Sequence, residues 1–291
     1  MKGIIITNPF DRSETQINKV KRMTDEFSGL GADVSVIPND RFLTYVDSGK
    51  TVNTVNADFV LYFDKDRYTA RMLEASGIRV FNRACATEIC DDKMLTHIAL
   101  ADAGIAMPTT LSGALCYVKD GEIDNGYLNS AVDKLGFPLV VKECYGSYGE
   151  QVYLVKDFDE LKSTASAIKG KPYLFQQFIA KSSGRDMRVI VIGGKVACGM
   201  IRQSLTDFRS NVKRGGKAAA VDVPRDIAEL CEKAARIIGL DYCGIDILLG
   251  ETPTLCEVNS NAMFSAMEQA TGVNVARLYA EHIINCVKNE R

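Results

Sequence analysis

The chain has 291 residues, of which 46% are hydrophobic and 25% charged, a composition that excludes a disordered or fibrous protein and a length that suits two or three domains. Its 35 basic residues are offset by 37 acidic ones, so the net charge of -2 excludes a general attraction to nucleic acid or to anionic membranes. No apolar run suits a signal peptide or a membrane span, and the nine cysteines form no Cys-x-x-Cys pair, so we expect a cytoplasmic protein.

The first 85 residues alternate short apolar strands with helices. Ser13 is expected to cap the first helix, in which Ile17, Val20 and Phe27 share one side. Such alternation predicts a small doubly wound α/β domain over residues 1–85. The predicted strands cover residues 3–7, 34–37 and 59–63, and a second helix covers residues 66–75.

The middle of the chain, residues 86–175, combines a capped helix with a loop that projects from a sheet. Asp91 is expected to cap a helix whose apolar residues are Met94, Leu95, Ile98 and Ala101. Residues 137–142 and 151–155 are predicted strands, and a strand over residues 173–179 is predicted to open the next unit.

Lys142 closes the first of these strands, and a turn with Gly146 and Gly149 follows it. A lysine at the end of an apolar strand is costly to bury without an anion, and backbone amides of the turn could meet the same anion. The pair therefore suggests a phosphate site, although a glycine turn alone is commonplace.

The remaining residues, 176–291, are predicted to form two hairpins and two helices. Strands over residues 187–192 and 195–201 are joined by Gly193 and Gly194, a strong signal for a tight turn. A helix over residues 226–238 ends at Gly239, and a last helix covers residues 275–287.

The last predicted hairpin, residues 244–259, places acidic groups opposite each other. A two-residue turn at positions 251 and 252 sets a register in which Asp246 faces Glu257, and Asn259 shares the face of Glu257. Opposed carboxylates repel, and this oxygen-only set suits a hard cation such as Mg²⁺. An isolated acidic pair is more often simply solvated, but apolar neighbours mark these strands as buried: Ile245, Ile247, Leu255 and Val258.

Residues 202–217 carry five basic side chains against the single acidic residue Asp207. Such a run is often a solvated loop. Beside a metal site and a phosphate-facing lysine, it favours a site for a nucleoside triphosphate. The basic residues are Arg202, Arg209, Lys213, Arg214 and Lys217.

Seven segments resemble the RimK-like ATP-grasp carboxylate–amine ligases, in the same order and at similar spacing. The resemblance covers residues 80–287, and its last three segments are highly specific in combination. It implies an ATP-grasp fold, in which an α/β pre-ATP-grasp domain precedes two α+β lobes that clamp ATP. The segments are Asp92-Lys93 and residues 138–142, 176–179, 186–188, 208–216, 244–247 and 256–259.

The resemblance also assigns roles to individual residues. ATP phosphates would meet Lys93 and Lys142 beside the loop of Gly146 and Gly149. The nucleotide would further contact Gln176, Gln177, Phe178 and Ile179 at the adenine and Asp186 at the ribose, with Ser210 and Asn211 near the phosphates. The catalytic candidates are Arg209, Arg188, Arg202 and Arg214. Two Mg²⁺ ions, or Mn²⁺ in their place, would be held by Asp246, Glu257 and Asn259.

The reaction implied is the activation of a carboxylate as an acyl phosphate, followed by attack of an amine. Substrates would be small molecules or peptides, with no nucleic acid and no membrane as partner, and homo-oligomers are common among ligases of this type. The two histidines, His97 and His282, are read as structural or surface groups.

Two alternatives stay open: a kinase that uses the same clamp to phosphorylate a hydroxyl group, and a nucleotide-binding protein without turnover. Gln177 replaces the glutamate of many relatives, which makes ATP less secure as the nucleotide. Residues 260–264 replace a Ser-Pro-Gly type of turn, which argues against a simple polyglutamate ligase.

Overall fold

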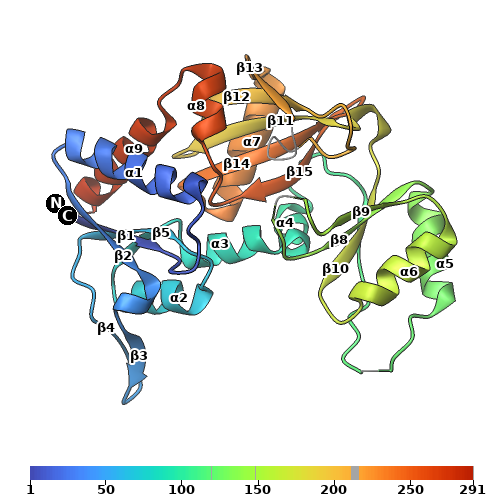
Figure 1. Ribbon diagram of the computed structural model, residues 1–291, viewed down its shortest axis with the longest axis horizontal. Helices are drawn as coiled ribbons and strands as arrows, with labels where there is room; N and C mark the ends of the chain where they lie inside the picture. The colour runs from blue at the N-terminus through green and yellow to red at the C-terminus, as the bar shows by residue number, and fades with distance from the viewer. Residues whose placement is uncertain (119, 148, 211–215, 291) are drawn as a thin grey trace.

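The computed structural model describes residues 1–118, 120–147, 149–210 and 216–290. Three sheets with covering helices make up most of the structure, and a small lobe carrying α5 and α6 stands apart from the rest (Figure 1). None of the helices in the described ranges is long and apolar enough to cross a membrane.

The N-terminal unit is a parallel sheet in the order β2-β1-β5-β6 with helices on both faces. Alternate residues of β1 point to opposite faces, so Ile4 and Ile6 pack with α2, while Ile5 packs with α1. The predicted doubly wound arrangement is confirmed. Its elements are β1 (Lys2–Thr7), α1 (Glu14–Gly29), β2 (Asp33–Pro38), β5 (Phe59–Phe63), α2 (Arg67–Ala75) and β6 (Arg79–Phe81), with β3 (Thr44–Asp47) and β4 (Lys50–Asn53) as a separate hairpin beyond a short turn η1 (Asn39–Arg41).

Two helices then lead into the small lobe, whose sheet has the order β7-β10-β8-β9. Helices α5 and α6 bury Leu128 and Leu161 against it. Strand β10 belongs to this sheet, so the predicted boundary between residues 175 and 176 falls inside a strand. The elements are α3 (Ala84–Asp91), α4 (Lys93–Leu100), β7 (Thr110–Ser112), α5 (Asn125–Leu135), β8 (Leu139–Glu143), β9 (Val152–Val155), α6 (Phe158–Ile168) and β10 (Tyr173–Gln177).

The C-terminal unit is an antiparallel sheet in the order β13-β12-β11-β14-β15. One face of β11 buries Val189 and Val191 against α7, which ends at Gly239 in the left-handed conformation that glycine adopts most easily. The other face carries Ile190 and Ile192 toward the last helices. The elements are η2 (Ala180–Ser182), β11 (Arg185–Ile192), β12 (Lys195–Gln203), β13 (Lys217–Val221), α7 (Arg225–Ile238), β14 (Tyr242–Leu249), β15 (Pro253–Asn259), α8 (Ser265–Thr271) and α9 (Val275–Asn289).

The N-terminal and C-terminal units share one hydrophobic core. Phe27 and Phe59 from the first unit lie in the same cluster as Tyr279 and Ile283 of α9. At the same junction, the buried side chain of Asn82 accepts from the backbone of β14 and donates to the carbonyl of Ser260. The two ends of the chain are therefore packed as one body, as Figure 1 shows for α1 and α9.

Two local predictions were wrong. Asp92, not Asp91, caps α4, because its carboxylate accepts from the amides of Met94 and Leu95, while Asp91 is the last residue of α3. In α1, Ile17 is largely exposed, and the buried side of the helix includes Lys19 instead.

Lys19 is a cation inside the shared core. Its ammonium donates to the backbone carbonyl and the side-chain oxygen of Asn261 and lies 4.1 Å from the centre of the Phe63 ring. Burial lowers the pKa of Lys19 to about 7. A lysine in an unfolded chain has a pKa near 10.4, so above about pH 7 the folded chain releases a proton that the unfolded chain keeps.

We therefore expect the free energy of unfolding of the wild type to rise with pH relative to that of Lys19→Met. Between about pH 7 and about pH 9 this difference should grow by about 2 kcal/mol. Urea unfolding of both proteins measures it, and the titration of thiols and phenols cancels in the comparison. Lys21→Met, at an exposed position of the same helix, serves as the control with no such trend. A difference that stays constant with pH would show that Lys19 is not protonated differently in the two states.

Candidate functional site

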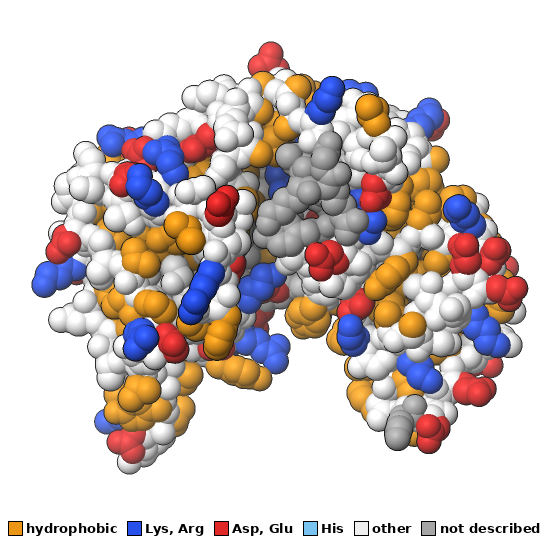
Figure 2. Space-filling model, in the orientation of Figure 1, with side chains coloured by type: hydrophobic (Ala, Val, Ile, Leu, Met, Phe, Trp, Pro, Cys, Tyr) orange, Lys and Arg blue, Asp and Glu red, His pale blue; other side chains and the backbone are white. Residues whose placement is uncertain are grey.

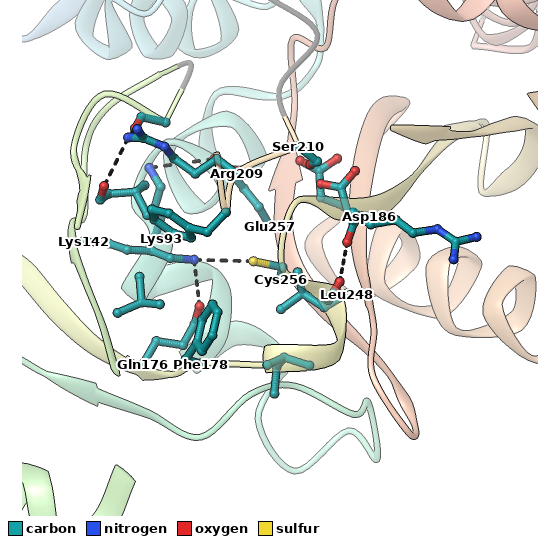
Figure 3. Close-up of a pocket in the computed structure, with 18 of the residues that line it drawn as sticks. Lys93, Lys142, Gln176, Phe178, Asp186, Arg209, Ser210, Leu248, Cys256 and Glu257 are labelled. Atoms are coloured by element: carbon teal, nitrogen blue, oxygen red, sulfur yellow. Dashed lines mark hydrogen bonds and ion pairs between the residues drawn. The ribbon is translucent and has the colours of Figure 1, made fainter. Parts of the chain in front are cut away.

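A cavity lies between the small lobe and the C-terminal sheet, and most of the residues predicted from the sequence line it. Figure 2 shows the molecule indented between the small lobe and the N-terminal unit, and Figure 3 shows Lys142 and Gln176 on one side of the cavity with Asp186 and Leu248 on the other. The predicted residues in its wall are Lys93, Lys142, Gly146, Gly149, Gln176, Gln177, Phe178, Ile179, Asp186, Arg202, Arg209, Ser210, Asp246 and Glu257.

The C-terminal sheet places two arginines and two aspartates together on one face. Register places Asp186 opposite Arg202 and Arg188 opposite Asp246 on neighbouring strands. Arg188 holds both oxygens of Asp246 at 2.7 Å, and Arg202 binds Asp186 and also reaches Asp246 at 2.9 Å. Two arginines and two aspartates thus form a buried group with no net charge.

This group fixes the ionisation of Asp246. Burial alone would raise the pKa of the carboxyl, but the charges of Arg188 and Arg202 outweigh burial and lower that pKa to about 2. Burial alone would lower the pKa of Arg202, but the carboxylates of Asp246 and Asp186 outweigh burial and raise that pKa. Asp246 is therefore ionised at neutral pH, with arginines already balancing its charge.

The last hairpin has the predicted facing pair but a different turn. Asp246 does lie opposite Glu257, whereas Ile247 pairs with Leu255, so Cys256 is an extra residue in β15. The loop is one residue longer than predicted, and a β-bulge at Cys256 restores the register before Glu257 is reached. The bulge brings the side chain of Cys256 into the cavity wall, which a regular hairpin would not have done.

The donors available for a divalent cation are oxygen atoms of Asp246, Glu257 and Asn259. Glu257 is partly exposed to the cavity, and one of its oxygens lies 3.8 Å from the ammonium of Lys93. The amide nitrogen of Asn259 is buried and has no hydrogen-bond partner within the described part of the chain, so it is free to donate to an anionic ligand while the side-chain oxygen faces the cation. These residues fit a hard cation such as Mg²⁺, with Asp246 shared between the cation and its arginines.

Two buried lysines face the cavity, Lys142 from β8 of the small lobe and Lys93 from the start of α4, which precedes that lobe. Lys142 donates to the side-chain oxygen of Gln176 at 2.7 Å and to the sulfur of Cys256 at 3.4 Å, as Figure 3 shows. Lys93 donates to the carbonyl oxygens of Cys144 and Gly146, at the base of the glycine loop. Lys142 is thus oriented by neutral acceptors, which keep its charge available to an anion, whereas Lys93 also lies 3.8 Å from the carboxylate of Glu257.

Gly146 gives the glycine loop its shape. Its φ of 154° is unfavourable for other residues, and a Cβ atom there would lie 2.3 Å from the side-chain oxygen of Gln151. Arg209 connects the loop to the C-terminal unit. Its guanidinium donates to the carbonyl oxygens of Gly149 and Val152 and also to the carboxylate of Asp207.

A second and larger cavity adjoins the first. Its volume is about 590 Å³, against about 130 Å³ for the first, and both are lined by Lys93, Arg202 and Glu257. Arg188 and Asn259 line only this second cavity. The N-terminal unit and residues 260–263 form much of the remaining wall.

The structure therefore gathers most of the predicted residues at two connected cavities. Asn211 and Arg214 lie outside the described residues. His97 was not among the predicted site residues. It is buried, and its Nε2 atom lies 3.0 Å from the amide nitrogen of Gln176. Its spacing of four residues from Lys93 on one helix was a usable signal. Cys256 was also not among them, and the sequence carries no signal for it.

One cluster of three potential metal ligands occurs among the described residues, away from these cavities. It consists of Asp241, His282 and Cys286, whose ligand atoms lie within 4.8 Å of one another. Arg79 already contacts both oxygens of Asp241 at 3.1 Å, so a cation is present at this carboxylate without a metal.

Comparisons with known proteins agree with the geometry. The chain is 34% identical over 233 residues to N-acetylaspartylglutamate synthase A of Homo sapiens, which is 78% of this chain and 58% of that protein. It is 35% identical over 225 residues to a protein of Psychromonas ingrahamii named probable alpha-L-glutamate ligase, which is 76% of this chain and 72% of that one. The chain thus spans less than two thirds of the human relative.

A solved structure shows the same fold over nearly the whole chain. The ATP-grasp ligase PsnB, complexed with a minimal precursor, Mg and ADP, superposes with a TM-score of 0.72 at 18% identity, covering 98% of this chain and 97% of that one. The expected ATP-grasp fold is confirmed. Residues 90–283 match the RimK-like ATP-grasp domain, and the chain belongs to this family.

Proposed function

We propose that the chain is an ATP-dependent ligase that joins a carboxylate to an amine through an acyl phosphate. The observation that carries the proposal is the facing pair Asp246 and Glu257, in the wall of a cavity that also contains Lys93, Lys142 and Arg202. Carboxylates for a cation beside three positive side chains form a site for a polyphosphate. Both relatives carry glutamate in their names, which supports an amino acid or a peptide as substrate.

The first cavity would hold the nucleotide. Lys142 would meet the phosphates from β8 and Lys93 from α4, with the amides of the glycine loop beside them. Residues 176–179 would contact the adenine. Asp186 would reach the ribose, for which it has to share its oxygens with Arg202.

A bound Mg²⁺, held by Asp246, Glu257 and Asn259, would screen the phosphate charges and align the γ-phosphate for attack. The PsnB structure contains Mg and ADP, which supports Mg²⁺ and an adenine nucleotide as ligands of this chain. The number of ions, two in the family pattern, is part of the proposal.

The second cavity would hold the carboxylate and the amine. Arg188 and Arg202 lie in its wall next to Glu257, where they can hold the substrate carboxylate near the γ-phosphate. A carboxylate oxygen forms a bond to the γ-phosphorus, the bond from that phosphorus to the β–γ bridging oxygen breaks, and ADP leaves. The amine nitrogen then bonds to the acyl carbon, loses a proton and releases phosphate. No side-chain nucleophile is required.

Glu257→Gln tests the cation site. The substitution keeps the size of the side chain and removes the charge, so we expect ADP formation to fall about a hundredfold or more, as on losing a group that stabilises the transition state. Circular dichroism and melting temperature should stay close to wild type, because Glu257 is partly exposed. Glu251→Gln, at the exposed tip of the same hairpin, is the matched control and should keep wild-type turnover. Wild-type turnover in Glu257→Gln would rule out this carboxylate as a cation ligand.

Hydroxylamine tests the acyl phosphate. It intercepts an activated acid, so we expect a hydroxamate that appears only with ATP, Mg²⁺ and an acid substrate, with one ADP for each hydroxamate. A panel of amino acids and peptides, assayed for hydroxamate and ADP together, makes the measurement. ADP formed with a phosphorylated hydroxyl product and no hydroxamate would support a kinase instead.

A further inference from the structure

His97 lies directly behind the phosphate-facing lysine of the proposed nucleotide site. It stands four residues after Lys93 in α4, so the two side chains share the buried face of that helix. Its Nε2 atom is 3.0 Å from the amide nitrogen of Gln176, whose oxygen accepts from Lys142. His97, Gln176 and Lys142 therefore form one continuous hydrogen-bonded row.

Thr110 fixes the orientation of the Gln176 amide. The hydroxyl of Thr110 donates its only proton to the carbonyl oxygen of Pro108 at 2.9 Å, so toward Gln176 it can only accept. The amide nitrogen of Gln176 must then face Thr110 and His97, and its oxygen must face Lys142. The reversed amide would direct N–H groups at an ammonium and leave Thr110 without its donor.

The same logic fixes the state of His97. An amide nitrogen only donates, so the Nε2 atom of His97 has to accept, and the ring is neutral with its proton on Nδ1. The surroundings agree, because burial, and after it the positive charge of Lys142, lower the pKa of His97 to about 4. Lys93 is also charged and lies on the same buried face of α4, one turn before His97.

We propose that His97 is a positioning residue: as a permanent acceptor it locks the Gln176 amide, whose oxygen in turn holds the Lys142 ammonium toward the nucleotide phosphates. This proposal rests on the proposed function, in which Lys142 meets those phosphates. A lysine has three N–H donors, and within the described residues Lys142 uses two of them, on Gln176 and Cys256. The third is directed to the anion when the first two are held.

Two substitutions of His97 separate positioning from packing. His97→Leu removes the acceptor, whereas His97→Gln places an amide oxygen where Nε2 was. In His97→Leu we expect the KM for ATP and the dissociation constant of the ATP analogue AMPPNP to rise about tenfold, the cost of one misplaced charge-assisted hydrogen bond, with a smaller change in kcat. His97→Gln should recover most of the affinity.

Ile98→Ala, on the exposed side of the same helix, is the matched control and should bind AMPPNP like wild type. Calorimetry with Mg²⁺ and AMPPNP measures all four proteins, and their melting temperatures show whether each is folded. Equal affinities in the Leu, Gln and wild-type proteins would overturn the proposal. So would an equal loss in the Leu and Gln proteins, since packing alone would then explain the effect.

Nitrogen NMR reads the state of His97 without any turnover. The chain has two histidines, so His97→Gln assigns both sets of ring signals. We expect His97 to stay neutral with its proton on Nδ1 from about pH 8 down to about pH 5. A proton on Nε2, or a charged ring in this range, would overturn the proposal.

These measurements also separate the two proposals. Suppose that the wild type forms no hydroxamate, while His97 has the predicted tautomer and His97→Leu binds AMPPNP more weakly. These results would support the positioning role and overturn the ligase.

Discussion

The strand register of the C-terminal sheet is the constraint on which the rest of the site depends. It sets Asp186 against Arg202, Arg188 against Asp246, and Asp246 against Glu257 across four neighbouring strands. Side chains alternate between the two faces of a strand, so a shift of one residue in any pair would send a charged group into the apolar core on the other side. Burial of the apolar side chains therefore fixes the strand register, and with it the positions of these charged groups.

Charge balance explains how so many ionised groups are buried together. Burial favours the protonated form of a carboxyl group, but the charges of Arg188 and Arg202 keep Asp246 ionised. The repulsion between Asp246 and Glu257, which suggested a cation from the sequence, is thus already reduced by protein groups. In the proposed function, these arginines have to divide their hydrogen bonds between the aspartates and the incoming substrate.

The sequence predicted much of the fold, because the relevant signals are local. Ser13, Gly239 and the Gly193–Gly194 pair mark ends of elements through capping and turn chemistry, and the structure has them at those places. Asp246 was correctly set opposite Glu257, although by two compensating differences, a longer loop and a bulge. What could not be predicted depends on contacts distant in sequence: the contact of Lys19 with Asn261, that of His97 with Gln176, and the core shared by the two ends of the chain.

The proposed ligase requires Asp246 and Glu257 to share a divalent cation beside a bound triphosphate. Crystals grown with Mn²⁺ and AMPPNP, with data collected at a wavelength where manganese scatters anomalously, locate that cation. We expect an anomalous peak within coordination distance of both carboxylates and of a phosphate oxygen, about 2.0–2.3 Å in each case. A well-ordered nucleotide with its manganese elsewhere, and Asp246 still bound only by Arg188 and Arg202, would contradict it.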